Sequence, residues 1–151
     1  MSALLRLPLA ALSLISAYGL YHSYQCIVRL RQYEEKSEKA AQYSNTAAEQ
    51  LHKTRTTQGS AAVSIILSFL SATALVFASP STTTAVLASA VNVAATLAVR
   101  VHVKSFWDNK AKVPFTTGYN EAISGTAELV KVLGVLGGVW AVELVGAVLK
   151  V

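Results

Sequence analysis

Long apolar runs alternate with charged stretches along this chain. Three of the four runs contain no charged residue, and the fourth is interrupted only by Glu143. A helix needs about 20 apolar residues to cross the ~30 Å hydrocarbon core of a bilayer. The pattern therefore predicts an all-α membrane protein with a single domain over 1–151. The expected transmembrane helices lie near 7–28, 61–79, 82–99 and 129–149.

A soluble four-helix bundle is the alternative to a membrane protein. Its helices would each carry a charged outer face, which the second and third runs lack. Hydrophobic residues make up 53% of the chain and charged residues 14%, against roughly 25% charged in an average soluble domain. The composition therefore favours the membrane. The third run contains several polar side chains, so we expect it to pack against other helices instead of facing lipid on all sides.

Positive charge is concentrated in the two segments 29–60 and 100–128, which hold ten of the 13 Lys and Arg residues. Four spans place both segments on the same side of the membrane. The positive-inside rule then makes both loops cytoplasmic and puts the termini on the opposite side. The basic residues, which give the chain a net charge of +5, therefore indicate its orientation in the membrane. We expect membrane lipids as partners and no nucleic acid.

The first run also resembles a cleavable signal, because Ala17-Tyr18-Gly19 is a small-x-small cleavage site. Cleavage would leave three spans and send the most basic loop to the lumen, against the charge rule, so a retained span is predicted. Only Arg6 is basic before Arg29, which is few for a mitochondrial presequence. We expect the endoplasmic reticulum or another endomembrane, with the inner mitochondrial membrane as the alternative.

The tripeptide Ser79-Pro80-Ser81 separates the second and third runs. Pro80 cannot continue the preceding helix but suits the first turn of the next, with Ser79 as the expected N-cap. The two runs thus form a tight hairpin. This hairpin either crosses the membrane twice or enters one leaflet as a wedge.

The basic loop 29–60 is rich in good helix formers and predicts a helical cytoplasmic extension. The first helix is expected to continue to about Tyr43 and turn back. The capping-box sequence from Thr46 to Glu49 would start the returning helix. A helix lying on the membrane surface is the alternative. Small and apolar residues form a packing seam at three-four spacing: Leu30, Tyr33, Ser37, Ala40, Ser44, Ala47 and Leu51.

Aromatic residues and lysines mix in 104–127, which favours the headgroup layer. Pro114 and Gly118 would break a helix there. We therefore expect a partly interfacial loop, with the last helix beginning in 121–128. The residues concerned are Phe106, Trp107, Phe115, Tyr119, Lys110 and Lys112.

Two polar residues fall within the predicted spans. An ionisable group such as Glu143 is costly to bury, so it predicts a proton carrier or a cation ligand. The alternative is that Glu143 lies near the membrane edge, where it reaches water or pairs with Lys150. Asn92 lies in the middle of the third run and is expected to form a hydrogen bond across a helix interface.

Small residues recur at four-residue spacing in the predicted spans. Such patterns let helix backbones approach closely, within one chain or between copies. We expect helix packing through these faces, with a homo-oligomer or other membrane proteins as partners. The candidate packing residues are Gly134, Gly138, Ser64, Ser68, Ala90 and Ala94.

Metal and catalytic sites are not predicted. His22 and Cys26 share a helix face and could combine with His102 at the same membrane boundary, but no fourth ligand is evident. No phosphate-binding loop, nucleophile elbow or metalloprotease motif occurs, so neither enzymatic activity nor a cofactor is expected.

Three functional hypotheses remain for such a chain. The first is a non-catalytic accessory, assembly or scaffolding component of a membrane complex. The second is a small proton- or cation-coupled transporter or channel that uses Glu143 and Asn92. The third is a membrane-shaping protein that inserts the hairpin of the second and third runs.

Overall fold

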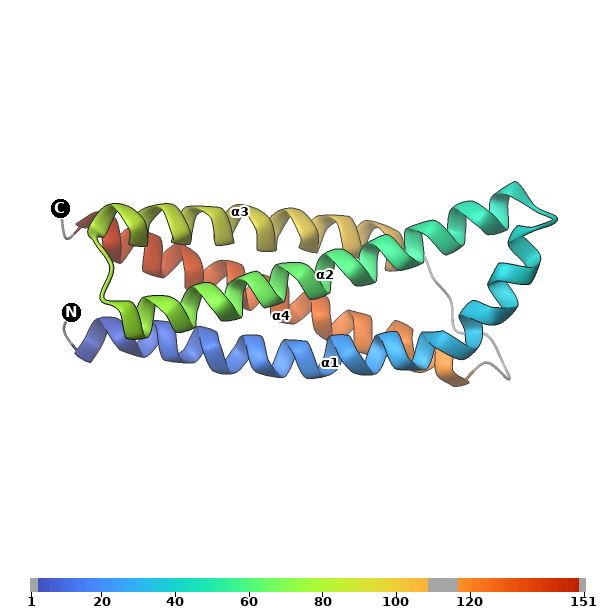
Figure 1. Cartoon of the computed structure of the whole chain (residues 1–151), viewed down its shortest axis with the longest axis horizontal. Coiled ribbons are helices and arrows are strands. Elements are labelled where there is room, and N and C mark those ends of the chain that lie inside the picture. The colour runs from blue at the N-terminus through green and yellow to red at the C-terminus, as the bar shows by residue number, and fades with distance from the viewer. Residues whose placement is uncertain (1–2, 109–116, 150–151) are drawn as a thin grey trace.

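Four long helices make up the computed structural model, which describes residues 3–108 and 117–149. The helices run antiparallel to their neighbours, and Figure 1 places both termini and the α2–α3 turn at one end of the molecule. The α1–α2 turn lies at the other end, which we call the loop end. The helices are α1 (Ala3–Ala41), α2 (Asn45–Ala78), α3 (Thr82–Trp107) and α4 (Thr117–Leu149).

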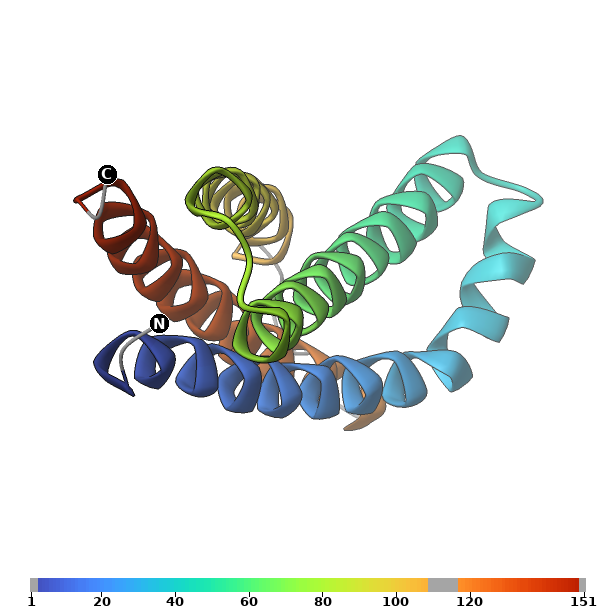
Figure 2. The same cartoon turned by 60° about the vertical axis from the view of Figure 1, so that its left-hand side comes forward.

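The helices form a ring in chain order. Each helix packs against the next, and α4 closes the ring by packing along α1. Across the ring, α2 and α4 meet over a short stretch, while α1 and α3 make no contact in the described residues. Figure 2 shows α1 beneath the bundle and α3 on the opposite side. This is an up-down-up-down bundle, as short connections between antiparallel neighbours favour.

The fold-back expected in 29–60 is confirmed, since α1 ends at Ala41 and α2 begins at Asn45. The expected cap at Thr46 is wrong by two residues. Ser44 has the extended backbone of an N-cap, and its side chain accepts a hydrogen bond from Ala47 N at 3.3 Å. Ser and Thr are both favoured N-cap residues, so neighbouring candidates are hard to distinguish by sequence.

The expected N-cap at Ser79 is also wrong. Ser79 is the C-cap of α2 and adopts a left-handed backbone with a φ of 44°, a conformation common after the last helical turn. Ser81 caps α3 instead, accepting from Thr84 N at 3.2 Å. Pro80 lies between the two caps, so the tight hairpin itself is confirmed.

Three of the helices, α2, α3 and α4, are long and apolar enough to cross a membrane. In the part of α1 whose side chains the structure describes, no stretch of the same length meets this criterion. The all-helical class is therefore confirmed, and three of its four helices are candidate membrane spans.

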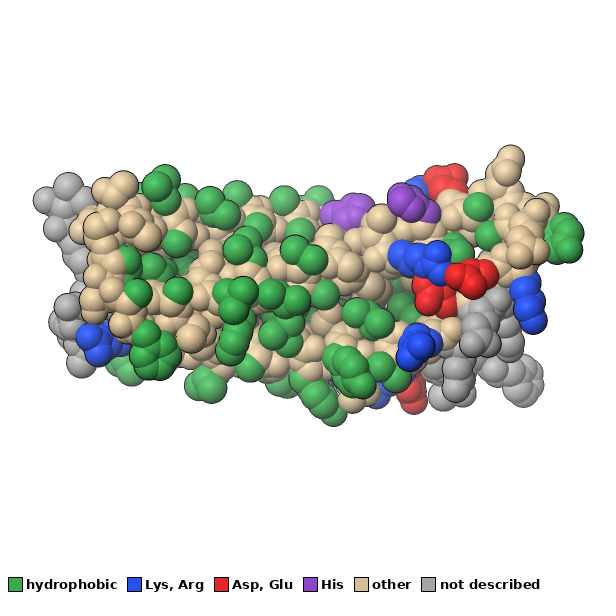
Figure 3. Space-filling model, in the orientation of Figure 1, with side chains coloured by type: hydrophobic (Ala, Val, Ile, Leu, Met, Phe, Trp, Pro, Cys, Tyr) green, Lys and Arg blue, Asp and Glu red, His purple; other side chains and the backbone are tan. Residues whose placement is uncertain are grey.

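Apolar side chains also cover the outside of the bundle. Leu14 on α1, Leu70 and Phe77 on α2, and Val142 on α4 are 74%, 59%, 82% and 64% exposed. Figure 3 shows charged side chains gathered at the loop end of this face, with hydrophobic side chains spread over the rest. An apolar surface of this extent on one end of a bundle is typical of contact with lipid.

Candidate functional site

Buried polar side chains link the helices in the middle of the bundle. Ser68 of α2 is fully buried, and its hydroxyl lies 2.9 Å from Ser16 Oγ of α1. Trp140 Nε1 of α4 donates to the same hydroxyl at 2.9 Å. One small residue thus joins three helices. Ser68 was expected as a packing residue, whereas the tryptophan offered no periodic signal in the sequence.

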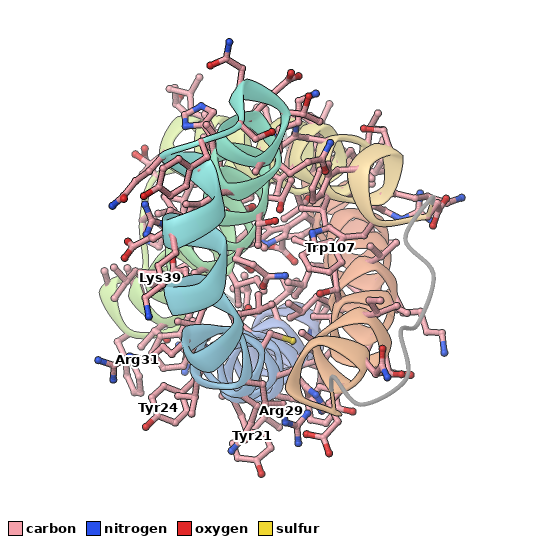
Figure 4. The ribbon with its side chains drawn as sticks, turned by 90° about the vertical axis from the view of Figure 1, so that its right-hand side faces the viewer. Tyr21, Tyr24, Arg29, Arg31, Lys39 and Trp107 are labelled. Carbon is pink, nitrogen blue, oxygen red and sulfur yellow. The ribbon has the colours of Figure 1, made fainter. Side chains whose placement is uncertain are left out.

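A second polar cluster lies near the loop end. Trp107 Nε1 donates to Thr57 Oγ1 at 2.9 Å, and Gln58 Nε2 donates to Thr126 Oγ1 at 2.8 Å. These two bonds connect α2 to α3 and to α4. In the view of Figure 4, the Trp107 side chain lies between the helices. Trp107 was expected in an interfacial loop, but α3 continues to this residue and buries it. Phe115, Lys110 and Lys112 lie outside the described residues.

Glu143 is buried, with 4% of its surface exposed. The antiparallel register places it on α4 at the level of Asn92 on α3. A Cβ at Gly137 of α4 would contact Leu97 of α3, so these two residues lie at one level. Glu143 lies six residues after Gly137, and Val91, the neighbour of Asn92, lies six residues before Leu97. The buried carboxyl group and Asn92 therefore share one layer of the bundle interior.

Asn92 does not form the cross-helix hydrogen bond that its sequence position predicted. It is 1% exposed, and its Nδ2 donates to Ala88 O of its own helix at 2.9 Å. Within the described residues, Asn92 Oδ1 and the nearby Ser89 hydroxyl are buried and have no hydrogen-bond partner. Two buried oxygen atoms at this level of the interior therefore make no hydrogen bond within the described residues.

The small residues expected at helix interfaces fall on different faces. Ser64 and Ser68 are buried on α2, but Ala94 is exposed and Ala90 only half-buried on α3. The face of α3 that packs inward carries Ser89, Asn92 and Thr96 instead. A stripe of polar side chains, one position away from the alanines, is thus the packing face.

The glycines of α4 divide in the same way. A Cβ at Gly134 would lie 2.9 Å from Arg100 Nε, and one at Gly137 would lie 2.6 Å from Leu97 Cδ2. Gly138 faces open space. The close approach of α4 to α3 therefore uses Gly134 with Gly137, and Gly138 of the predicted pair lies on the outer surface.

The three candidate metal ligands are not brought together. Cys26 is fully buried on α1, and His102 is exposed on α3, a helix that does not contact α1 in the described residues. No cluster of three metal-binding side chains occurs in the part of the chain that the structure describes. His22 instead packs edge-on against Tyr18, with ring centroids 4.5 Å apart.

A surface cavity of about 450 Å³ opens between α1 and α4 at the loop end. We call it the α1–α4 cavity. Arg29 Nε of α1 pairs with Glu121 Oε2 of α4 at 3.0 Å, so an ion pair forms part of the wall. Glu128 pairs with Lys131 at 2.9 Å on the side away from the loop end. The lining residues are His22, Arg29, Asn120, Glu121, Ser124, Gly125 and Glu128.

Aromatic and basic side chains follow one another on the outer face of α1. Tyr21 and Tyr24 are 60% and 65% exposed, and Figure 4 shows them pointing away from the bundle, with Arg29 and Arg31 nearby. Lys39 continues the basic series on the same helix. Tyrosine followed by arginine and lysine is the usual order of side chains across a membrane–water boundary.

The part of α1 and α2 nearest the loop end is held by ion pairs. The Arg55 guanidinium of α2 binds both Glu34 and Glu38 of α1, and the hydrogen bonds of these carboxylates raise the pKa of Arg55. On the exposed side of α2, Glu49 pairs with Lys53 at 2.6 Å, and this hydrogen bond lowers the pKa of Glu49. Exposed pairs of this kind contribute little individually, but the two carboxylates on one arginine fix the register of the hairpin.

No protein family, curated protein or solved structure is significantly similar to this chain. The fold and the surfaces described above are therefore the only basis for a functional conclusion.

Proposed function

We propose that this chain is a four-span membrane protein that acts as a non-catalytic assembly component, with its α1–α2 extension as the docking platform. The observation that carries the proposal is that α1 and α2 continue past Trp107, the last residue of α3. The extension exposes charges of both signs, including Glu49 and Lys53. A rigid, charged hairpin on an apolar bundle is suited to contact another protein at the membrane surface.

The lengths of the helices support four spans. From Ala61 to Ala78, α2 contains no charged residue and rises about 27 Å, close to the hydrocarbon thickness of a bilayer. Packing along both α2 and α4 gives α1 the same depth. Exposed Leu7 and Leu14 on its outer face match a lipid environment. The charge rule then places the loop end in the cytoplasm, and endomembranes are the first location to examine.

The same lengths favour a transmembrane α2–α3 hairpin over a wedge in one leaflet. A cysteine replacing Ser81, in a Cys26→Ser background, should react only with a reagent added from the side opposite the loop end. Tyr43→Cys should react only from the loop side. Labelling of both positions from one side would contradict the four-span topology.

Assembly is tested by extracting the tagged protein from its own membrane in a mild detergent and measuring its native mass and composition. We expect a particle with a stoichiometric partner. The charge swap Glu49→Lys with Lys53→Glu keeps an i,i+4 pair but reverses the surface pattern, so it should release the partner without unfolding the bundle. Thr83→Ser, on an exposed position at the opposite end, is the matched control. A small homo-oligomer of wild type would refute the assembly role.

A proton- or cation-coupled transporter is the second candidate, favoured by the burial of Glu143 at the level of Asn92 and Ser89. A carboxyl group within the apolar layer is the expected carrier in such a protein. Proton flux into proteoliposomes should disappear in Glu143→Gln and persist in Glu49→Gln. Equal flux in wild type and Glu143→Gln would remove this candidate.

A further inference from the structure

We propose that the α1–α4 cavity binds the headgroup of an ethanolamine phospholipid from the leaflet at the loop end. This inference rests on the proposed four-span topology, and it adds a specific lipid to the assembly role. It is carried by the size, the depth and the charges of the cavity.

The volume and the lining of the cavity fit a headgroup. About 450 Å³ lies within the range of roughly 300–1,000 Å³ that small-ligand sites occupy. The wall consists of charged and polar side chains together with Gly125. A Cβ at Gly125 would lie 2.7 Å from the buried Cys26 Sγ, so α4 packs closely against α1 at this position and forms the inner wall of the cavity.

The depth of the cavity matches the headgroup layer. His22 lines the cavity and packs against Tyr18 and Tyr21, whose rings are exposed on α1. Tyrosines of this kind are enriched at the boundary between hydrocarbon and water. Lys131, which binds Glu128, is also exposed at the membrane side of the cavity. A lipid beside α1 and α4 would therefore place its phosphate at the cavity.

The charges distinguish between headgroups. Arg29 supplies the cation of the cavity wall, and Glu121 and Glu128 supply two carboxylates. Arg29 uses its Nε for Glu121, and a guanidinium has further N–H donors for a phosphate. Each carboxylate has several lone pairs, so one ion pair leaves room for an ammonium donor. The cavity thus offers a site for both ends of a phosphoethanolamine zwitterion.

Other abundant phospholipids match this arrangement less well. The quaternary ammonium of choline has no N–H group to donate to Glu121 or Glu128. A glycerol headgroup has no cation, and a serine headgroup brings an additional carboxylate close to two existing ones. Charge-assisted hydrogen bonds from a primary ammonium are therefore the expected basis of selection.

Native mass spectrometry of the purified full chain with added lipids tests this proposal. Ethanolamine phospholipid should bind about tenfold more tightly than the choline, glycerol or serine lipid with the same acyl chains, as one charge-assisted hydrogen bond would give. Soluble phosphoethanolamine should compete only weakly, because it lacks the chains that hold a lipid at this depth. Effective competition by the soluble compound would show that the cavity binds a free metabolite and would overturn the lipid assignment.

Three variants separate the contributions of the two carboxylates and the guanidinium to lipid binding. Glu121→Gln and Glu128→Gln should each reduce the preference for ethanolamine over choline, whereas Arg29→Gln should weaken both lipids because they share a phosphate. Thr83→Ser, at the opposite end of the bundle and outside the cavity, should leave the binding of every lipid unchanged. Equal binding of the glycerol lipid, or an unchanged preference in both glutamate variants, would refute the proposal. Topology and partner binding are measured separately, so they can stand if lipid selection fails.

Discussion

Ser68 joins three helices in the middle of the bundle, so its replacement by alanine tests how strongly buried hydrogen bonds stabilise this protein. The side chains of Ser16, Ser68 and Trp140 are all fully buried. In Ser68→Ala the Trp140 N–H loses its acceptor. The Ser16 hydroxyl can still turn to a backbone carbonyl of its own helix. The variant therefore leaves one donor without a partner.

The expected loss follows from these two hydrogen bonds. A hydrogen bond between membrane helices contributes on average ~0.6 kcal/mol, and a buried donor without a partner costs about 1–3 kcal/mol. We therefore expect Ser68→Ala to lower the free energy of unfolding by about 1–3 kcal/mol and Ser16→Ala by ~0.6 kcal/mol.

Cys26 provides the assay, because it is fully buried and is the only cysteine. Its alkylation in detergent micelles with increasing dodecyl sulfate reports the unfolded fraction. Ser64→Ala is the matched control, since Ser64 lies one turn away on α2 and its buried hydroxyl has no partner in the described residues. The reasoning fails if Ser68→Ala is no more destabilising than Ser64→Ala, or if Ser16→Ala costs more than Ser68→Ala.

Three further predictions concern packing and charge. Gly19→Ala would place a methyl group 2.9 Å from a buried valine side chain of α4. The same alkylation assay should show that the free energy of unfolding falls by about 1–3 kcal/mol in this variant and is unchanged in Gly138→Ala. Arg55→Gln removes both inter-helix pairs of the extension, so amide exchange should accelerate there and stay unchanged in the bundle; faster exchange in both would contradict a local role. Lys53 lowers the pKa of Glu49, so their pair stabilises the folded extension at neutral pH. This stabilisation is lost as the pH falls through the lowered pKa of Glu49. An NMR titration should show a higher pKa for Glu49 in Lys53→Gln.

The helices themselves could be predicted from the sequence because uncharged runs of this length have few alternatives. The fold-back between α1 and α2 was also predictable, since one straight helix could not return to the second run. The N-cap residues could not be predicted in the same way. Ser44 and Thr46 are both favoured N-cap types, and the structure uses Ser44.

The inward faces of the helices could not be derived from residue spacing alone. On α3, the series with Ala90 and Ala94 and the series with Ser89, Asn92 and Thr96 both satisfy helical periodicity. In a lipid environment, a polar side chain gains more than an alanine by turning inward, because hydrocarbon offers no hydrogen bonds. The structure follows this rule and exposes Ala94.

The α1–α4 cavity depends on a contact between residues far apart in the sequence. Arg29 and Glu121 are separated by the whole of α2 and α3, and only the closure of the helix ring brings them within 3.0 Å. Neither residue belongs to a motif that would announce the pair. Each was part of a charged loop in the sequence, where solvation is the ordinary role of a charge.

The two faces of α1 differ in polarity, and the bundle explains this difference. Its polar and small positions Ser16, Gly19 and Ser23 are buried toward the neighbouring helices, while Leu7 and Leu14 face outward. A hydropathy average weights both faces equally, although only the outer face would meet lipid. Tyr18, Tyr21 and Tyr24 are also exposed on α1. In the proposed four-span topology, α1 therefore crosses the membrane as the fourth wall of a bundle whose interior supplies its hydrogen-bond partners.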